Sequence, residues 1–231
     1  MTPGPRIAVV SGGAGAIGGA IVDALGATGH QVVVLDRTGD VACDLSSNAS
    51  AVEAAKVVIE RFGRCDVFVH CAGYWDAMML HELDLSRWRD VQAVNIESGV
   101  WLAQAFAEGM ATRGFGRIIF IASDAVWSPP DTASLPYVAS KGAVVAVMRS
   151  LAVALGKDRI AVTAVAPGLT DTPASRVVAP AGALSAVVDR QALKRPLVPE
   201  DTANVVAFLA SDGAEAMTGQ LLVVDGGATK R

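Results

Sequence analysis

The chain has 231 residues, of which 52% are hydrophobic and 18% are charged, and its formal net charge is −4. This length and apolar content suffice for one domain with a large core, and they exclude an intrinsically disordered protein. The small negative charge gives no electrostatic reason to expect a nucleic acid or an anionic membrane as partner. Because no linker-like segment divides the chain, we expect a single domain over residues 1–231.

Cysteine and histidine patterns favour a cytoplasmic protein without a bound metal. Cys43, Cys65 and Cys71 form an odd set without paired spacing, which is typical of reduced thiols. The three histidines lack a metal-ligand pattern, so we expect no metal site. The first residues lack the basic and apolar regions of a signal peptide, and no apolar stretch is expected to span a bilayer, which takes about 18–20 residues.

Strand-like and helix-like segments alternate along the chain. The expected strands are residues 6–10, 31–35, 41–43, 66–70, 117–122, 160–166 and 221–224. The expected helices are residues 17–28, 49–62, 87–113, 136–156 and 201–211. The strands are continuously apolar, as in a parallel sheet covered on both faces. The pattern therefore predicts an α/β fold, a single-domain Rossmann-type doubly wound parallel sheet of about seven strands with helices on both faces.

A glycine-rich segment, residues 11–18 (Ser-Gly-Gly-Ala-Gly-Ala-Ile-Gly), joins the first expected strand to the first helix. Glycine lets the backbone turn sharply and approach a pyrophosphate, while the N–H groups and dipole of the helix N-terminus attract the anion. This motif alone is also compatible with a tight strand-to-helix connection.

An acidic residue at the end of the second expected strand also supports dinucleotide binding. Asp36 ends the second expected strand, 18 residues after Gly18. A carboxylate there accepts hydrogen bonds from the adenosine ribose and repels a 2′-phosphate, which favours NAD over NADP. Arg37 leaves both cofactors open, because its guanidinium can pair with a 2′-phosphate or stack on adenine.

Tyr137 and Lys141 are four residues apart at the start of an expected helix, so they share one helical face. A fixed cation near a phenol favours phenolate and lowers the pKa of the tyrosine, which makes it suitable for proton transfer to a ketone or from an alcohol. A core tyrosine beside a surface lysine is the structural alternative. Ser123 follows the fifth expected strand and points toward the same crevice, where its hydroxyl can bind the substrate oxygen.

Together these motifs resemble the short-chain dehydrogenase/reductase family over nearly the full chain. In family order they are the glycine-rich turn, Asp36, Asn95, Ser123, the Tyr137-x-x-x-Lys141 pair, residues 167–172 (Pro-Gly-Leu-Thr-Asp-Thr), residues 218–220 (Thr-Gly-Gln) and residues 224–227 (Val-Asp-Gly-Gly).

The resemblance implies roles for the matching residues. Tyr137 would be the general acid/base, Ser123 would hold the substrate oxygen, Lys141 would bind the nicotinamide ribose, and Asn95 would hold a water that links Lys141 to solvent. Asp44 and Leu45 would meet the adenine, and Thr172 the nicotinamide carboxamide. The implied cofactor-binding residues are Gly12, Gly15, Ala16, Ile17, Gly18, Asp36, Arg37, Asp44, Leu45, Cys71, Ala72, Gly73, Tyr137, Lys141, Pro167, Gly168, Thr170 and Thr172.

The sequence departs from the family pattern at four places. Ala16 replaces the middle glycine, Ser11 replaces a threonine, and His70-Cys71 replaces a pair of asparagines before Ala72-Gly73. The segment between Ser123 and Tyr137 is one residue longer than in many members. The lost asparagine amides remove expected side-chain hydrogen bonds, and Cys71 is expected to be a buried rather than a reactive thiol.

Substrate specificity is expected in the loops after the strands and in a lid around residues 173–196. The candidate pocket residues are Trp75, Trp127, Val177 and Leu184, whose apolar character favours a hydrophobic or aromatic ketone or secondary alcohol. These residues could equally pack the lid or an oligomer interface.

The sequence thus predicts an NAD-dependent oxidoreductase that interconverts a secondary alcohol and a ketone. A 3-oxoacyl-thioester reductase is the alternative within the family, and a non-catalytic dinucleotide-binding scaffold or sensor is the alternative of another class. The resemblance also implies a homotetramer or homodimer, built across the helices of Asn95 and Tyr137 and the C-terminal segment.

Overall fold

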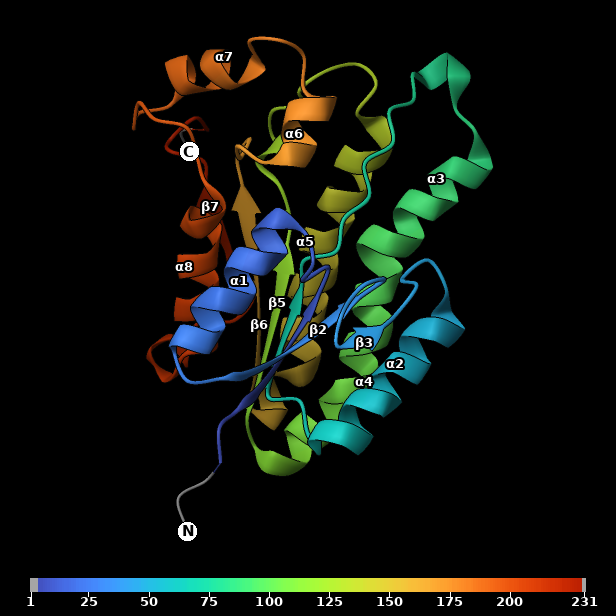
Figure 1. Cartoon of the computed structure of the whole chain (residues 1–231), viewed down its shortest axis with the longest axis vertical. Helices are drawn as coiled ribbons and strands as arrows, with labels where there is room; N and C mark the ends of the chain where they lie inside the picture. The colour runs from blue at the N-terminus through green and yellow to red at the C-terminus, as the bar shows by residue number, and fades with distance from the viewer. Residues whose placement is uncertain (1–3, 230–231) are drawn as a thin grey trace.

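The computed structural model describes residues 4–229 and forms one seven-stranded parallel sheet (Figure 1). The strands are β1 (Ile7–Ser11), β2 (Gln31–Asp36), β3 (Val41–Ala42), β4 (Val67–His70), β5 (Gly116–Ile121), β6 (Ile160–Pro167) and β7 (Leu221–Val224). Their order across the sheet is β3-β2-β1-β4-β5-β6-β7. This confirms the predicted Rossmann-type fold, in which the strand order reverses between β1 and β4.

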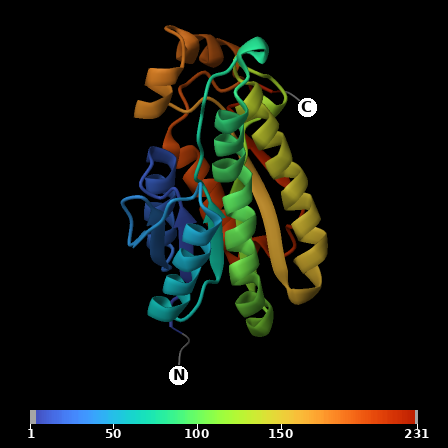
Figure 2. The ribbon, with the colours of Figure 1, turned by 90° about the vertical axis from the view of Figure 1, so that its right-hand side faces the viewer.

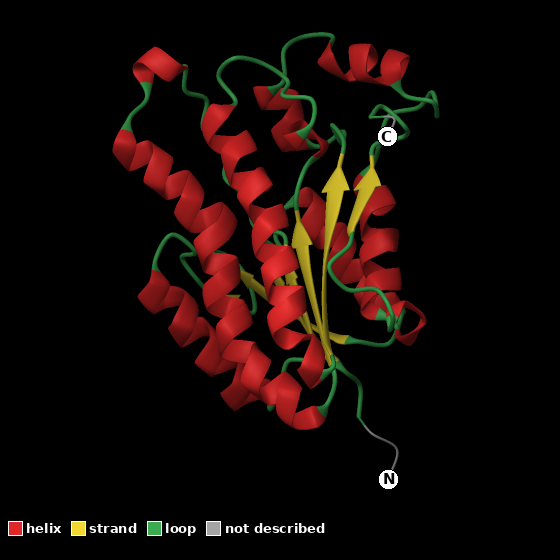
Figure 3. Cartoon of the chain, turned by 180° about the vertical axis from the view of Figure 1, so that it is seen from behind, coloured by secondary structure: helices red, strands yellow, loops and turns green. Residues whose placement is uncertain are grey.

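Helices cover both faces of the sheet, and two further helices lie beyond the ends of the strands. In chain order the α-helices of the described residues are α1 (Ala16–Ala27), α2 (Asn48–Phe62), α3 (Leu85–Gln92), α4 (Ser98–Arg113), α5 (Leu135–Leu155), α6 (Pro173–Val178), α7 (Ala183–Arg190) and α8 (Pro199–Ala210). Figures 2 and 3 show the layers from two other directions. Alternate side chains of each strand point to opposite faces, so the continuously apolar strands build two separate cores.

The two cores differ in the helices that close them. Val9 of β1 and Phe68 of β4 pack with α2, α4 and α5. Val10 and Val69, the next residues of the same strands, pack with α1 and α8 on the other face. This double cover holds the carboxyl ends of the strands in place, and α6 and α7 lie beyond those ends, near the top of Figure 1.

The structure corrects one expected helix. Residues 87–113 are not a single helix, because a π-helix over Ala93–Glu97 separates α3 from α4. A π-turn inserts an extra residue into the helical period, and such turns are frequent at functional sites. The lid is also more regular than expected, since it contains α6 and α7.

One apolar helix is longer than the sequence led us to expect of any apolar stretch. Leu135–Asp158, which comprises α5 and the turn after it, is long and apolar enough to span a membrane by length and composition. The same segment packs Val144 and Met148 into the sheet core and buries Lys141. These are the properties of a core helix of the fold.

Candidate active site

The glycine-rich turn is fixed by contacts inside the protein. Gly12 has φ +74°, and a Cβ there would lie 2.6 Å from the backbone of Ala72, which follows β4. A Cβ on Gly18 would lie 2.1 Å from the carbonyl oxygen of Gly12. Both positions therefore require glycine because the turn, α1 and the end of β4 touch one another directly.

Gly15 is different, because the protein itself leaves room for a side chain there. A Cβ on Gly15 would meet only the carbonyl oxygen of Gly12, at 3.4 Å. Gly15 is the N-cap of α1, no side chain caps this helix, and its first turn contains no acid. The N–H groups of Ala16 and Ile17 belong to this uncapped turn, so its geometry fits the pyrophosphate of a dinucleotide.

The Asp36 carboxylate faces the glycine-rich turn. One of its oxygens accepts a hydrogen bond from the Ala14 N–H at 3.1 Å, and the other accepts from the Arg37 N–H at 2.7 Å. The Arg37 side chain is exposed. Asp36 therefore lies beside the phosphate-binding turn, where a ribose hydroxyl would meet it.

The predicted adenine contacts divide into one exposed and one buried side chain. The Asp44 carboxylate accepts hydrogen bonds from the Ser46 N–H and hydroxyl, which lower the pKa of Asp44. Leu45 is buried in the core under α2, so only its backbone could meet an adenine.

His70 fills the first of the two positions where the family has asparagine. It is buried, its Nδ1 lies 2.8 Å from the Ser11 hydroxyl, and its Nε2 lies 3.3 Å from the Asn95 carbonyl oxygen. The ring also fits against Gly99, where a Cβ would approach it to 2.7 Å. Burial, assisted by the charge of Lys141, lowers the pKa of His70 to about 3, so the ring is neutral.

The segment after His70 runs between the glycine-rich turn and Lys141. Cys71 is half-buried rather than buried as expected, and desolvation raises the pKa of its thiol to about 12, which disfavours the reactive thiolate. Ala72 is buried against Gly12, and Gly73 is exposed, with the Lys141 Nζ 3.8 Å from the position of an added Cβ. The Ala72-Gly73 backbone can thus approach a cofactor.

Ser123, Tyr137 and Lys141 come together just beyond the carboxyl end of β5. The Ser123 hydroxyl is near enough to the Tyr137 hydroxyl to favour its ionised form. The Lys141 Nζ lies 5.6 Å from the centre of the Tyr137 ring, and it donates a 2.7 Å hydrogen bond to the Ile121 carbonyl oxygen. The structure therefore places the three predicted side chains in one site.

The pKa of Tyr137 differs from the expectation that Lys141 lowers it. Burial raises the pKa of Tyr137 to about 12, while the Ser123 hydroxyl opposes part of this increase. Lys141 is itself buried, which lowers its pKa to about 8. Its ammonium group is directed at Ile121 and lies beside the phenol ring, so desolvation dominates at Tyr137.

Asn95 lies in the π-helix and connects two parts of the site. Its Oδ1 accepts a 2.6 Å hydrogen bond from the Tyr74 N–H, and its Nδ2 donates to the Tyr74 carbonyl oxygen at 3.1 Å and to the Ser140 hydroxyl at 2.8 Å. Ser140 in turn donates to the Tyr137 carbonyl oxygen at 2.6 Å. Asn95 thus ties the loop after β4 to the helix of Tyr137; a water held by Asn95 remains a prediction.

The residues after β6 are held by their own contacts. Gly168, directly after Pro167, is tight because a Cβ there would lie 2.9 Å from the Asp225 Cβ. The Thr170 hydroxyl donates to the Gly168 carbonyl oxygen at 3.0 Å. Thr172 is the N-cap of α6, and its hydroxyl accepts from the Ser175 N–H at 3.0 Å. Thr172 followed by Pro173, an N-cap residue before a first-turn proline, was a signal in the sequence for the start of α6.

The four predicted pocket residues differ in position. The Trp75 ring lies 4.6 Å from the Tyr137 ring, centre to centre. Trp127 packs against the sheet core, Leu184 is half-buried, and Val177 is 85% exposed. The structure therefore places Trp75 against a predicted catalytic side chain.

Sequence reasoning missed Asp124, the residue after Ser123. Its side chain is partly buried, and burial raises its pKa to about 6, with the nearby charge of Asp225 contributing in the same direction. The Ser123 hydroxyl opposes part of this increase, so the Asp124 carboxyl lies beside Ser123. Among residues 4–229, no group of three His, Cys, Asp or Glu side chains is arranged to hold a metal ion.

Comparison with known proteins agrees with this geometry. A family model described as enoyl-(acyl carrier protein) reductase matches residues 12–229, nearly the whole chain. The chain belongs to the short-chain dehydrogenase/reductase family. It is therefore an oxidoreductase of a family that acts on CH–OH groups and binds NAD(P).

Relatives of this short-chain dehydrogenase/reductase have different named substrates. Cis-4-hydroxycyclohexanecarboxylate dehydrogenase of Sinomonas cyclohexanicum is 33% identical, over 97% of this chain and 96% of the relative. The 3-oxoacyl-[acyl-carrier-protein] reductase MabA of Mycobacterium tuberculosis is also 33% identical, over 96% and 92%. The crystal structure of gox2181 superposes with a TM-score of 0.91 at 29% identity, covering 98% of this chain and 96% of gox2181.

Proposed function

We propose that this protein catalyses the NAD-dependent interconversion of a secondary alcohol and a ketone, with Tyr137 as general acid/base. The observation that carries the proposal is the grouping of Ser123, Tyr137 and Lys141 at the carboxyl end of β5. The glycine-rich turn and Asp36 lie at the same edge of the sheet, where ligands of doubly wound folds bind.

In the proposed reaction, each residue of the site has one role. The nicotinamide ring, when bound, accepts or supplies the hydride. Ser123 holds the substrate oxygen by a hydrogen bond, and the Tyr137 hydroxyl gives a proton to that oxygen during ketone reduction or removes one during alcohol oxidation. Gly15 and the start of α1 bind the pyrophosphate, and Lys141 binds the ribose beside the reacting atoms.

The electrostatics of the pair support proton donation at neutral pH. With a pKa of about 12, Tyr137 is protonated and can act as the acid for reduction. Lys141, with a pKa of about 8, is mostly charged below that pH. Its positive charge then stabilises the phenolate that forms as the proton leaves, so the buried pair is suited to a reversible transfer.

The test of this function is Tyr137→Phe, and the chain offers a matched control. The variant removes one hydroxyl, and turnover should fall by about 10²–10⁴, the usual contribution of a general acid/base. Tyr74 is the other tyrosine of the chain, and its side chain is 42% exposed. The Tyr74→Phe variant should therefore keep the turnover of the unaltered protein. Turnover is followed by the absorbance of the reduced cofactor. Unchanged turnover in Tyr137→Phe would overturn the proposal, and dinucleotide binding without turnover in the unaltered chain would favour a scaffold or sensor.

The cofactor preference for NAD is supported by the place of Asp36. A carboxylate directed at the phosphate-binding turn should repel a 2′-phosphate. We expect NADH to bind about tenfold or more tightly than NADPH, which corresponds to about 1.4 kcal/mol. Fluorescence titration measures both affinities. Asp36→Asn should reduce the preference, whereas Asp23→Asn, an exposed acid on α1, should leave it unchanged; tighter binding of NADPH by the unaltered chain would contradict this assignment.

The substrate is proposed to be hydrophobic or aromatic. The Trp75 ring packed on Tyr137 supports this, because it gives an apolar wall beside the reacting oxygen. The similarity to MabA keeps a 3-oxoacyl thioester as the second candidate. Cyclic and aryl ketones, compared with a 3-oxoacyl thioester at equal concentration, distinguish the two candidates by their kcat/KM.

Assembly and compartment complete the proposal. We propose a homotetramer or homodimer formed through the helices of Asn95 and Tyr137 and the C-terminal segment, and a cytoplasmic location. Three free cysteines are consistent with a reducing compartment.

A further inference from the structure

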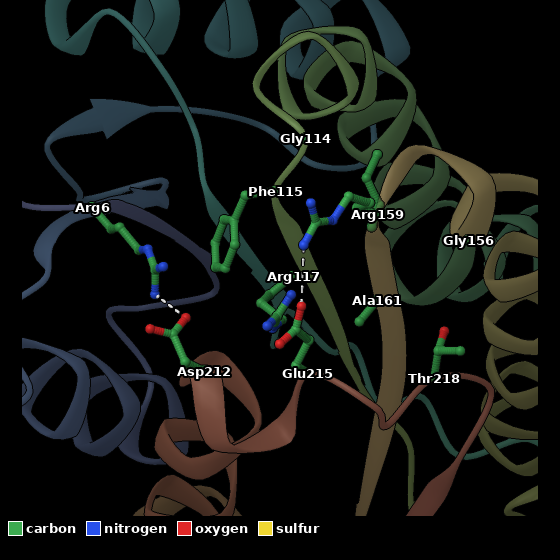
Figure 4. A pocket seen from close by; sticks show the side chains of 11 residues that line it. Arg6, Gly114, Phe115, Arg117, Gly156, Arg159, Ala161, Asp212, Glu215 and Thr218 are labelled. Carbon is green, nitrogen blue, oxygen red and sulfur yellow. Dashed lines mark hydrogen bonds and ion pairs between the residues drawn. The ribbon is translucent and has the colours of Figure 1, made fainter. Parts of the chain in front are cut away.

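A hollow lies at the edge of the sheet opposite to Ser123. It is a cavity of about 410 Å³ at the amino ends of the strands, within the size range of small-molecule sites. Three arginines from three segments, Arg6, Arg117 and Arg159, line it together with Phe115 (Figure 4). We call this hollow the arginine pocket.

Arg117 is the unusual member of the arginine pocket. It is only 4% exposed, its Nη1 donates to the Gly116 carbonyl oxygen at 3.1 Å, and its Nε is buried without a hydrogen-bond partner. Nearby Asp66, at the same edge of the sheet, is buried too, but it accepts hydrogen bonds from Arg64 and Arg113. Asp66 thus has two ion-pair partners, whereas Arg117 has no ion pair among the described residues and interacts with Asp212 and Glu215 only through their charges.

The two acids of the arginine pocket pair with its other two arginines, not with Arg117. Arg6 pairs with Asp212 at 2.8 Å, and Arg159 pairs with Glu215 at 3.3 Å. Among the described residues, none forms an ion pair with Arg117. The side chains of Asp212 and Glu215 are 75% and 70% exposed, so both can move aside. The pocket therefore has three positive and two negative side chains, with a net charge of about +1.

Phe115 holds two of the guanidinium groups in place. The centre of its ring is 3.8 Å from the Arg6 guanidinium carbon and 4.5 Å from that of Arg117. Stacking on the ring fixes each guanidinium plane and leaves its N–H edges free to donate. Burial, and the like charge of Arg6, lower the pKa of Arg117, while the charges of Asp212 and Glu215 oppose part of this decrease.

We propose that the arginine pocket binds a phosphate group, either as inorganic phosphate or on a small phosphomonoester. Phosphate suits it better than a carboxylate, because three terminal oxygens can accept from guanidinium groups that approach from three segments. A dianion can also compete with Asp212 and Glu215 for their arginines, whereas a single carboxylate adds only one more negative charge. The guanidinium group of Arg117, which lines the pocket, would then donate to a phosphate oxygen.

Equilibrium dialysis of the full chain with radiolabelled inorganic phosphate tests the proposal. Chloride is used to keep the ionic strength constant, since screening weakens such contacts. Because the glycine-rich turn at the other edge also attracts phosphate, the measurement is made with saturating NADH, which occupies that turn. Under these conditions we expect one phosphate per chain. Loss of phosphate binding with NADH would assign the ion to that turn and overturn the proposal. Unlabelled glycerol 3-phosphate and unlabelled phosphate are then compared as competitors. The stronger competitor shows whether the pocket prefers a phosphomonoester or inorganic phosphate.

Charge variants make the test specific. Arg159→Gln, at an exposed side chain, should weaken phosphate binding about tenfold, and Glu215→Gln should strengthen it. Arg117→Met should abolish binding, with circular dichroism to check folding. The matched control is Arg176→Gln, an exposed arginine on α6 that pairs with Asp171. Equal affinities in Arg159→Gln and Arg176→Gln, or no saturable binding in the unaltered chain, would refute the site.

Discussion

At the scale of single residues, His70 shows how a buried titratable group links pH to stability. Its ring is neutral and connects Ser11 of β1 to the π-helix at Asn95. The folded-state pKa is about 3, and the ordinary value is 6.5. Below pH 6.5 the unfolded chain binds a proton that the folded protein does not bind until about pH 3. The contribution of His70 is therefore present above pH 6.5 and is lost as the pH falls.

This predicts a specific loss of stability in mild acid. As the pH falls from about 6.5 to 5, the free energy of unfolding should decrease through His70 alone, with a slope that rises from about 0.7 to about 1.4 kcal/mol per pH unit. Chemical denaturation at several pH values measures it. His70→Gln should be less stable at pH 7 because it breaks the contacts with Ser11 and Asn95, but its pH slope should be smaller. His81→Gln, at an exposed histidine, should keep the original slope; identical slopes in all three proteins would show that His70 does not titrate this way.

Other site residues show where residue-level prediction ends. It could be predicted that Ser123, Tyr137 and Lys141 lie close together. The prediction needed only the spacing of Tyr137 and Lys141 and the position of Ser123 after a strand. The pKa of Tyr137 was not predictable, because it depends on burial by segments far away in the chain. The same holds for Asn95, whose side chain bonds Tyr74 and Ser140 across three elements. Such contacts leave no local pattern.

At the scale of elements, the strands were predicted well because a parallel sheet covered on both faces needs continuously apolar strands. The helix over residues 87–113 was predicted as one piece, since hydrophobic spacing cannot reveal the π-helix Ala93–Glu97 within it. That turn places the Asn95 carbonyl oxygen toward His70. The short lid helices were missed, although Thr172 followed by Pro173 is a visible start signal for α6.

At the scale of the whole molecule, the two edges of the sheet have different chemistry. The carboxyl edge holds the glycine-rich turn, Asp36 and Tyr137, as expected of a doubly wound fold. The amino edge holds the arginine pocket, which no motif indicated because its arginines come from distant segments. Fold topology therefore determines the proposed catalytic site, while the second site depends on side chains particular to this chain.

The outer face of α5 carries the last prediction, which concerns assembly. Only 33% of the most apolar stretch of this helix is buried within one chain, and Val153 is 86% exposed. Small residues lie along the helix, and a Cβ on Gly142 would meet nothing within 4 Å, so another helix can approach closely. Light scattering should find a dimer or tetramer. Val153→Arg should shift it toward smaller species by placing a charge in the interface, whereas Val177→Arg, at an equally exposed valine of α6, should not. A monomer in the unaltered protein, or the same mass for both variants, would show that α5 does not form the interface.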